Sequence, residues 1–228
     1  MLKQSSPNFD DRKGCDAPSL VILHYTGMID GASAIARLCD AASKVSAHYV
    51  VEEDGRVFQL VDEAKRAWHA GKSFWRGIVD VNSHSIGIEI VNPGHEFGYR
   101  PFPGEQMQAV LKLCLEIKAR YTLPATAFIG HSDVAPLRKE DPGELFDWKM
   151  LAQNGIGIWP EPLAQDDEPL TLVGAEKLLS GIGYDCGIDE ESLHAALRAF
   201  QRHFVQHRVT GQLDSDTAKT LRAVSRVF

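Results

Sequence analysis

The sequence predicts an α/β fold with a mixed central β-sheet flanked by helices, followed by a small C-terminal three-helix domain. Three observations support this prediction. Short apolar runs bounded by turn residues alternate with segments of helical periodicity. A hairpin signal in the first half indicates at least one antiparallel pair of strands. Near residue 155 a stretch rich in proline, glycine and acidic residues separates this part from a mostly helical remainder.

The first half of the chain supplies a strand, a helix and a hairpin, in that order. SLVILHYTG, residues 19–27, is an apolar run typical of a buried strand. GASAIARLCDAAS, residues 31–43, has the composition of a helix. SAHYVVEEDGRVFQLV, residues 46–61, predicts a hairpin, because two β-rich runs flank Asp54-Gly55, a strong tight-turn signal.

A second apolar strand, a long helix and a third strand follow. HSIGIEIVN, residues 84–92, is apolar enough to lie inside a sheet. GEQMQAVLKLCLEIKARY, residues 104–121, carries apolar side chains at helical spacing and predicts an amphipathic helix. ATAFIGHSD, residues 125–133, predicts a strand that leads into an irregular loop.

The C-terminal part is expected to be a separate helical domain. We assign residues 1–160 to a first domain, 161–170 to a linker and 171–228 to the helical domain. Asp214 or Ser215 is a suitable residue to cap the last helix. The three expected helices lie at about residues 174–179, 189–204 and 213–224.

Composition excludes several classes of protein. The 44% apolar and 24% charged residues are ordinary for a globular protein, and the net charge of −7 argues against a nucleic-acid binder. No apolar run is long enough to span a membrane. The first residues lack the apolar core of a secretory signal, so we expect a cytoplasmic protein. A signal upstream of the printed sequence would instead place the protein in the periplasm.

One irregular stretch gathers residues that could bind a metal. GHSDVAPLRKEDPGELFDW, residues 130–148, contains His131, Lys139 and Asp141, and its prolines and glycines argue against a regular helix or strand. His24 likewise lies where an apolar strand gives way to a loop. Three nitrogen or oxygen ligands with one open position are typical of catalytic zinc. The alternative is an ordinary polar surface loop.

Glu89 is the residue that favours a functional site. It lies among aliphatic residues in SIGIEIVN, and a buried carboxylate needs either a partner or a function. Burial would raise its pKa towards neutrality, which suits a general base. If the strand instead lies at the edge of the sheet, Glu89 would point to solvent.

Five ordered motifs resemble one enzyme family. LHYTG, SAHYVVEEDGRVFQLV, RAWHAG, NSHSIGIEIVN and GHSDVAPLRKEDPGELFDW together resemble the zinc-dependent N-acetylmuramoyl-L-alanine amidases, which include phage T7-type lysozymes and peptidoglycan recognition proteins. The likeness covers roughly residues 5–160. The segment after residue 170, with AFQRHF and TGQLDSDTAKTL, resembles a small peptidoglycan-binding domain. Alternatively, this segment only covers the catalytic domain or forms a dimer contact.

The resemblance implies a role for each motif residue. It implies one zinc ion per chain held by His24, His131 and Asp141, with Glu89 as general base and Lys139 stabilising the oxyanion. The remaining motif residues are expected to line the substrate cleft or support it rather than bind metal, and they are His48, Trp68 and His69.

The implied reaction is hydrolysis of the bond between N-acetylmuramic acid, or its 1,6-anhydro form, and L-alanine of the stem peptide. Expected partners are muropeptides released during peptidoglycan recycling. Three alternatives remain: an envelope amidase acting on intact peptidoglycan, a non-catalytic recognition module, and a zinc peptidase that cleaves within the stem peptide.

Overall fold

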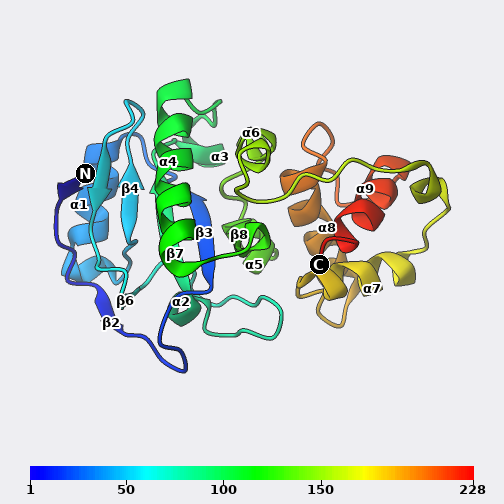
Figure 1. Ribbon diagram of the computed structural model, residues 1–228, viewed down its shortest axis with the longest axis horizontal. Helices are drawn as coiled ribbons and strands as arrows, with labels where there is room; N and C mark the ends of the chain where they lie inside the picture. The colour runs from blue at the N-terminus through cyan, green and yellow to red at the C-terminus, as the bar shows by residue number, and fades with distance from the viewer.

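A six-stranded mixed sheet forms the centre of the molecule, and the computed structural model describes residues 1–228 (Figure 1). The order across the sheet is β1-β5-β4-β7-β3-β8, and β2 pairs with β6 in a separate antiparallel ribbon. The strands are β1 (Leu2–Lys3), β2 (Phe9–Asp11), β3 (Leu20–Tyr25), β4 (Tyr49–Val51), β5 (Val57–Gln59), β6 (Lys65–Ala67), β7 (Ser85–Ile90) and β8 (Phe128–Gly130).

The two central strands are β3 and β7, which run parallel to each other. The hairpin predicted around Asp54-Gly55 is confirmed, since β4 and β5 pair antiparallel. Strand β7 lies between β4 and β3, so the alternative that placed Glu89 on an edge strand is wrong. The mixed α/β architecture expected from the sequence is therefore present.

Helices cover both faces of the sheet. They are α1 (Gly31–Cys39), α2 (Val81–His84), α3 (Gly94–Phe97), α4 (Gly104–Tyr121), α5 (His131–Val134), α6 (Trp148–Gln153), α7 (Leu172–Ile182), α8 (Glu190–Phe204) and α9 (Ser215–Ser225). Short 3-10 turns lie at η1 (Ala41–Ser43), η2 (Ala125–Ala127) and η3 (Ala164–Asp167).

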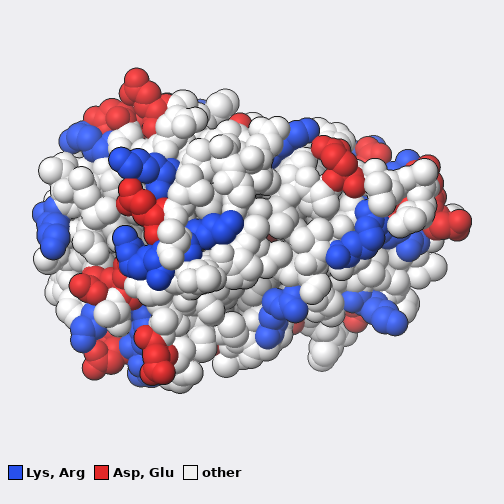
Figure 2. Space-filling view, viewed as in Figure 1, with Lys and Arg blue, Asp and Glu red and all other residues white.

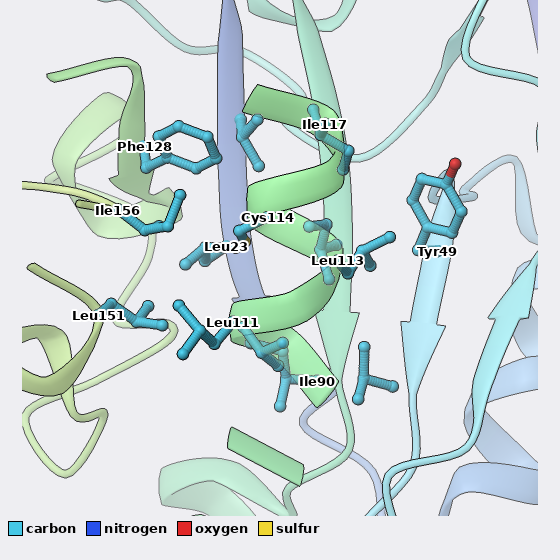
Figure 3. Close-up of a cluster of buried hydrophobic side chains, with 14 of the residues drawn as sticks. Leu23, Tyr49, Ile90, Leu111, Leu113, Cys114, Ile117, Phe128, Leu151 and Ile156 are labelled. Carbon is cyan, nitrogen blue, oxygen red and sulfur yellow. The ribbon is translucent and has the colours of Figure 1, made fainter. Parts of the chain in front are cut away.

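The main core lies between α4 and one face of the sheet, as Figure 3 shows. Alternate residues of a strand point to opposite faces, so Leu23, Ile88 and Ile90 point towards α4. Cys114 and Ile117 of α4 meet them and are fully buried. Helix α4 spans the residues predicted for it, because its apolar stripe matches the helical period.

The opposite face of the sheet is covered in two parts. Over β4 and β5, α1 packs Ile35 and Leu38 against Val50. Over the other end, a second core joins Leu20 and Ile22 of β3 to side chains of the three C-terminal helices. The apolar side chains of helices α7 to α9 are therefore continuous with those of the sheet. Figure 1 shows the three helices grouped beside β8 and α5.

The C-terminal helices have the expected caps. Asp214, one of the two suggested caps, accepts a hydrogen bond from the backbone of Thr217 at 2.8 Å. Asp189 caps α8 through Ser192 in the same way. Helix α7 is longer than predicted, because its first turn is capped by Thr171.

Two predicted elements are shorter than expected. The helix predicted over 31–43 ends at Cys39, since Asp40 adopts an extended conformation and its carboxylate accepts a hydrogen bond from Ala42. Of the strand predicted over 125–133, only β8 is extended, and His131 begins the one-turn helix α5.

Charged side chains of both signs are interspersed on the face seen in Figure 2, with no single large basic patch there. This distribution fits the net charge of −7 and does not favour binding to a nucleic-acid backbone. No helix is both long and apolar enough to cross a membrane.

Candidate active site and metal centre

A pocket of about 570 Å³ opens on the face of the sheet opposite α4. His24 of β3 and Glu89 of β7 are paired neighbours in the parallel register, so both side chains leave the sheet on this face. Helix α1 forms one wall of the pocket, and the segment after β8 contributes His131, Lys139 and Asp141.

Three side-chain atoms converge at the base of this pocket. His24 Nδ1 lies 2.9 Å from His131 Nδ1 and 2.9 Å from Asp141 Oδ2. His131 Nδ1 also lies 2.9 Å from Asp141 Oδ2. All three residues are buried and could hold one metal ion. The structure thus brings together the three residues that the sequence proposes as ligands.

The tautomer of His131 follows from its other nitrogen. Nε2 lies 3.0 Å from the carbonyl oxygen of Ala70, which can only accept, so Nε2 carries a proton and donates it. In the neutral ring Nδ1 is then left with its lone pair facing the other two groups.

The tautomer of His24 follows from a longer chain of hydrogen bonds. Ser85 Oγ donates to the carbonyl oxygen of Val81 at 2.6 Å, so it must accept from His69 Nε2 at 3.2 Å. Because the pKa of His69 is far below its usual value, mainly through burial, its ring is neutral and Nδ1 is unprotonated. His69 Nδ1 therefore accepts from His24 Nε2 at 3.0 Å.

Burial also lowers the pKa of His24 to about 4, and the neighbouring His131 adds to this effect. The ring is therefore neutral near pH 7, with its proton on Nε2 and its Nδ1 bare. Two imidazole lone pairs and a carboxylate oxygen then face one another at 2.9 Å. Such an arrangement of electron pairs is stabilised by a metal ion or a shared proton among them, and two nitrogens with one carboxylate oxygen are a donor set that fits a metal site.

Glu89 is the unpaired acid of the pocket. Its Oε2 is buried and has no hydrogen-bond partner. Burial raises the pKa of Glu89 well above its usual value, and the nearby Asp141 raises it further. A carboxylate whose affinity for a proton is raised in this way is suited to accept a proton and return it, as a general base requires.

Lys139 reaches the same pocket from the loop between the two ligands. Its backbone N–H donates to Ala135 O at 3.0 Å. This hydrogen bond closes a turn from which the chain leads to Asp141. The backbone N–H of Ser132 donates to Asp141 O at 2.8 Å and closes the loop. The irregular stretch thereby brings the two candidate ligands His131 and Asp141, together with Lys139, into the same pocket.

The three remaining predicted residues differ in position. Trp68 lines the pocket and is partly exposed, with Nε1 donating to Asp10 at 3.1 Å. His69 also borders the pocket, but both of its ring nitrogens are used to orient His24 and to reach Ser85.

His48 is fully buried, does not line the pocket, and accepts from the backbone of Gly87 at 3.0 Å. Its expected contact with substrate therefore needs correction: the ring has no exposed surface to offer, and it supports the strand beneath the site.

Other pocket residues were missed by sequence reasoning. Arg37 and Met28 line the wall beside α1, and Phe97 of α3 lines the pocket as well. Arg37 had only the pattern of an exposed helix residue. Ser85 does not line the pocket but contacts His69, and it carries a stronger signal, since it is a polar residue at the start of an apolar strand.

The arrangement suits hydrolysis of an amide. Two neutral imidazoles and a carboxylate can hold a cation, Glu89 can move a proton, and Lys139 can stabilise developing negative charge. The hydrogen bonds to Ala70 and His69 fix the orientation of both rings, as outer partners of metal ligands do.

Comparison with known proteins agrees with this chemistry. The family model for N-acetylmuramoyl-L-alanine amidase matches residues 14–144. The N-acetylmuramoyl-L-alanine amidase AmiD of Escherichia coli is 36% identical over 227 residues, covering 90% of this chain and 81% of that protein. The 1,6-anhydro-N-acetylmuramyl-L-alanine amidase AmpD of Citrobacter freundii is 34% identical over 160 residues, covering 63% of this chain and 83% of that protein.

Solved structures show the same likeness over the whole chain. The complex of E. coli AmiD with anhydro-N-acetylmuramic acid-L-Ala-D-gamma-Glu-L-Lys superposes with a TM-score of 0.84 at 33% identity, covering 97% of this chain and 98% of that one. AmpDH3 from Pseudomonas aeruginosa in complex with anhydromuramic pentapeptide gives 0.85 at 31% identity, covering 100% and 99%. The chain therefore belongs to the N-acetylmuramoyl-L-alanine amidase family and is an amidase of that family.

Proposed function

We propose that this amidase is zinc-dependent and cleaves the bond between N-acetylmuramic acid and L-alanine in muropeptides, including the 1,6-anhydro form. The observation that carries the proposal is the convergence of three ligand-type atoms in the pocket that also contains Glu89, which has an unpartnered buried carboxylate oxygen. Two nitrogens and one oxygen with room for a further ligand are the donor set of catalytic zinc.

The metal would be held by His24, His131 and Asp141. When bound, zinc would supply Lewis-acid chemistry, which polarises a carbonyl and lets water ionise near neutral pH. Glu89 would take the proton from the attacking water and return it to the departing amine of L-alanine. Lys139 would donate to the oxygen that becomes negative as the carbonyl carbon turns tetrahedral.

The pocket supports a fragment as substrate. Its volume of about 570 Å³ lies within the range of sites that enclose small ligands. Two relatives that align with nearly all of this chain were solved with anhydromuramyl peptides bound. Trp68 offers a partly exposed aromatic surface on which a sugar ring or an apolar part of the peptide could lie.

A helical C-terminal domain at residues 171–228 belongs to this proposal. Its likeness to peptidoglycan-binding domains remains a prediction, and the core that it shares with β3 supports a role in completing the amidase. We also place the reaction in the cytoplasm, as part of recycling. Four free cysteines, none of them in a disulfide, suit a reducing compartment, and cell fractionation with antibody detection tests this location.

Product analysis tests the proposed reaction. Purified protein is loaded with zinc and incubated with an anhydromuramyl tripeptide, and the products are identified by mass spectrometry. Release of the intact peptide with a free L-alanine amine is expected. Cleavage between two amino acids would instead identify a peptidase, and activity on sacculi alone would identify an enzyme of the polymeric wall.

A further inference from the structure

The last turns of α8 lie against the segment that carries two of the ligands. We call residues 130–148 the metal-binding segment, because it contains His131, Lys139 and Asp141. Helices α5 and α8 are in contact, although α8 follows α5 by more than fifty residues in the chain (Figure 1). Three polar contacts join α8 and the residues just after it to the metal-binding segment.

The first contact is a buried cluster around Asp133. His203 Nδ1 donates to Asp133 Oδ2 at 2.7 Å, and Tyr184 Oη donates to Oδ1 at 2.6 Å. The same Oδ2 accepts the backbone N–H of Gly130 at 2.7 Å. Asp133, His203 and Tyr184 are at most 3% exposed, so no water is available to replace these donors.

This cluster fixes the turn that orients His131. Asp133 bridges the backbone of Gly130, immediately before the proposed ligand His131, to the side chains of His203 in α8 and Tyr184 in the loop after α7. The His203 ring is in turn stacked on Trp148 at a centroid distance of 3.9 Å. Asp133 is therefore held by the C-terminal helices as well as by its own turn.

The second and third contacts hold the later part of the metal-binding segment, on either side of Asp141. Arg202, which is 9% exposed, donates to Glu140 Oε1 at 2.6 Å, and Glu140 lies between Lys139 and Asp141. Gln206 Nε2 donates to the carbonyl oxygen of Phe146 at 2.6 Å. The three contacts therefore reach the segment just after His131, between Lys139 and Asp141, and after Asp141.

We propose that His203 and Arg202 are positioning residues of the amidase: His203 sets the orientation of His131 through Asp133, and Arg202 sets that of Lys139 and Asp141 through Glu140. This inference rests on the proposed metal site. Its physical basis is that ligand geometry must be held to within a fraction of an ångström, and a displacement of about 1 Å at a reacting group can cost roughly 100-fold in rate.

Metal affinity in the full-length protein tests the role of His203. His203→Phe keeps a ring to stack on Trp148 but removes the donor to Asp133, and we expect zinc to bind roughly tenfold more weakly in competition with a chromogenic chelator. His203→Asn loses the ring but can still donate to Asp133, and we expect near-normal affinity. His194→Phe is the matched control, since His194 lies on the same helix and donates to Gly211 within the C-terminal helices.

Arg202 is tested by kinetics. Arg202→Met should lower kcat roughly fivefold with little change in KM, because a lost ion pair of this kind displaces Lys139 without removing a substrate contact. Arg198→Met on the same helix is the control and should leave kcat unchanged.

The outcomes separate this inference from the proposed function. If the wild-type protein binds no zinc, the proposed metal site fails. If it binds zinc and His203→Phe binds as tightly, only the positioning role fails. If His194→Phe loses as much zinc affinity as His203→Phe, the loss reflects lower stability of the C-terminal helices in general, and the inference is also overturned. Thermal unfolding gives the melting temperature of each variant. The inference is supported if zinc affinity is lost only in the variant that lacks the hydrogen-bond donor to Asp133, whatever the order of the melting temperatures.

Discussion

At the scale of single residues, the ring of His24 shows how the site controls protonation. Its Nε2 proton is fixed by a relay through His69 to Ser85, and its Nδ1 is left free for the metal. None of the relay residues would bind metal itself. Removal of a ligand and removal of the general base should therefore have different signatures.

The ligand variant is His131→Ala. It should lose both zinc and activity, because two remaining ligands cannot hold the ion tightly. Metal content after gel filtration, measured by atomic emission, and amide hydrolysis check this. His207→Ala, an exposed histidine of the C-terminal part, is the matched control and should retain both. Full zinc content in the His131 variant would remove His131 from the ligand set.

Variants of the proposed general base, Glu89, and of Lys139 separate catalysis from zinc binding. Glu89→Gln should keep its zinc and fold but lose about 10² to 10⁴ in turnover, the usual contribution of a general base. Lys139→Ala should lose about 10² to 10³ if it acts as an oxyanion donor. Single-turnover rates at saturating substrate measure both. A near-normal rate for Glu89→Gln would transfer the role to another residue of the pocket.

His48 predicts how stability depends on pH. Burial lowers its pKa to about 3, so the unfolded ring takes up a proton below about pH 6.5 while the folded ring does not. Stability contributed by the neutral ring is present above pH 6.5 and falls by about 1.4 kcal/mol for each unit below it, down to about pH 3.

Urea unfolding at several pH values measures the effect of His48. His48→Asn should reduce the dependence of the unfolding free energy on pH between 6.5 and 4 by about 1.4 kcal/mol per pH unit, since one side chain no longer titrates while His24 and His69 still do. Its stability at pH 7.5 serves as the reference, because packing losses appear there at full size. An unchanged slope would show that His48 is already protonated in the folded protein.

At the scale of elements, sequence patterns predict what is local. The apolar stripe predicts α4 with its observed bounds, and the Asp54-Gly55 turn predicts the β4–β5 pairing. The break of the first helix at Asp40 was missed, because a capping carboxylate competes with helix propagation over only a few residues. Motif order predicted the three candidate ligands that the structure brings together. The choice of ring nitrogen depends on contacts to Ala70 and His69 that no sequence periodicity records.

Residue 87 of strand β7 must lack a side chain for the hydrogen bonds that link Ser85, His69 and His24 to form. A Cβ added there would overlap the ring of His69, which lies directly over the strand. Gly87→Ala should therefore displace His69, free the Nε2 proton of His24, and weaken zinc binding, with a loss of about 1–3 kcal/mol in stability from overpacking.

A chelator titration and a thermal melt check the Gly87 variant. The control is Gly181→Ala in α7, where nothing lies within 4 Å of the added Cβ. That control should gain about 0.5–1 kcal/mol, since alanine favours a helix interior. Unaltered zinc affinity in Gly87→Ala would show that His69 can move without consequence for His24.

At the scale of the whole molecule, the shared core decides what the C-terminal helices do. Leu20 and Ile22 of β3 pack in the same cluster as Phe200 and Leu221. Contacts between such distant parts of the chain, like those of α8 with the metal-binding segment, leave no local signal in the sequence. The pattern could predict three helices but not that they complete the site.

Deletion of residues 171–228 should therefore expose apolar surface of the sheet, lower stability, and impair cleavage of sacculi and of soluble muropeptides alike. Turnover on both substrates and a thermal melt measure this. A wall-anchoring module would instead lose mainly the activity on sacculi, because tethering raises effective concentration only at a polymer. Full-length Glu89→Gln that sediments with purified sacculi would support anchoring.

The shared core also has a consequence for biosynthesis. Helices α8 and α9 leave the ribosome well after β3 and the metal-binding segment, and their side chains complete the apolar cluster that contains Leu20 and Ile22. Pairings over such long sequence separations form late and slowly. A nascent chain therefore carries all three proposed ligands before it carries the helix that contacts the segment holding two of them. Hydrolysis of muropeptides should begin only after helices α7 to α9 have docked.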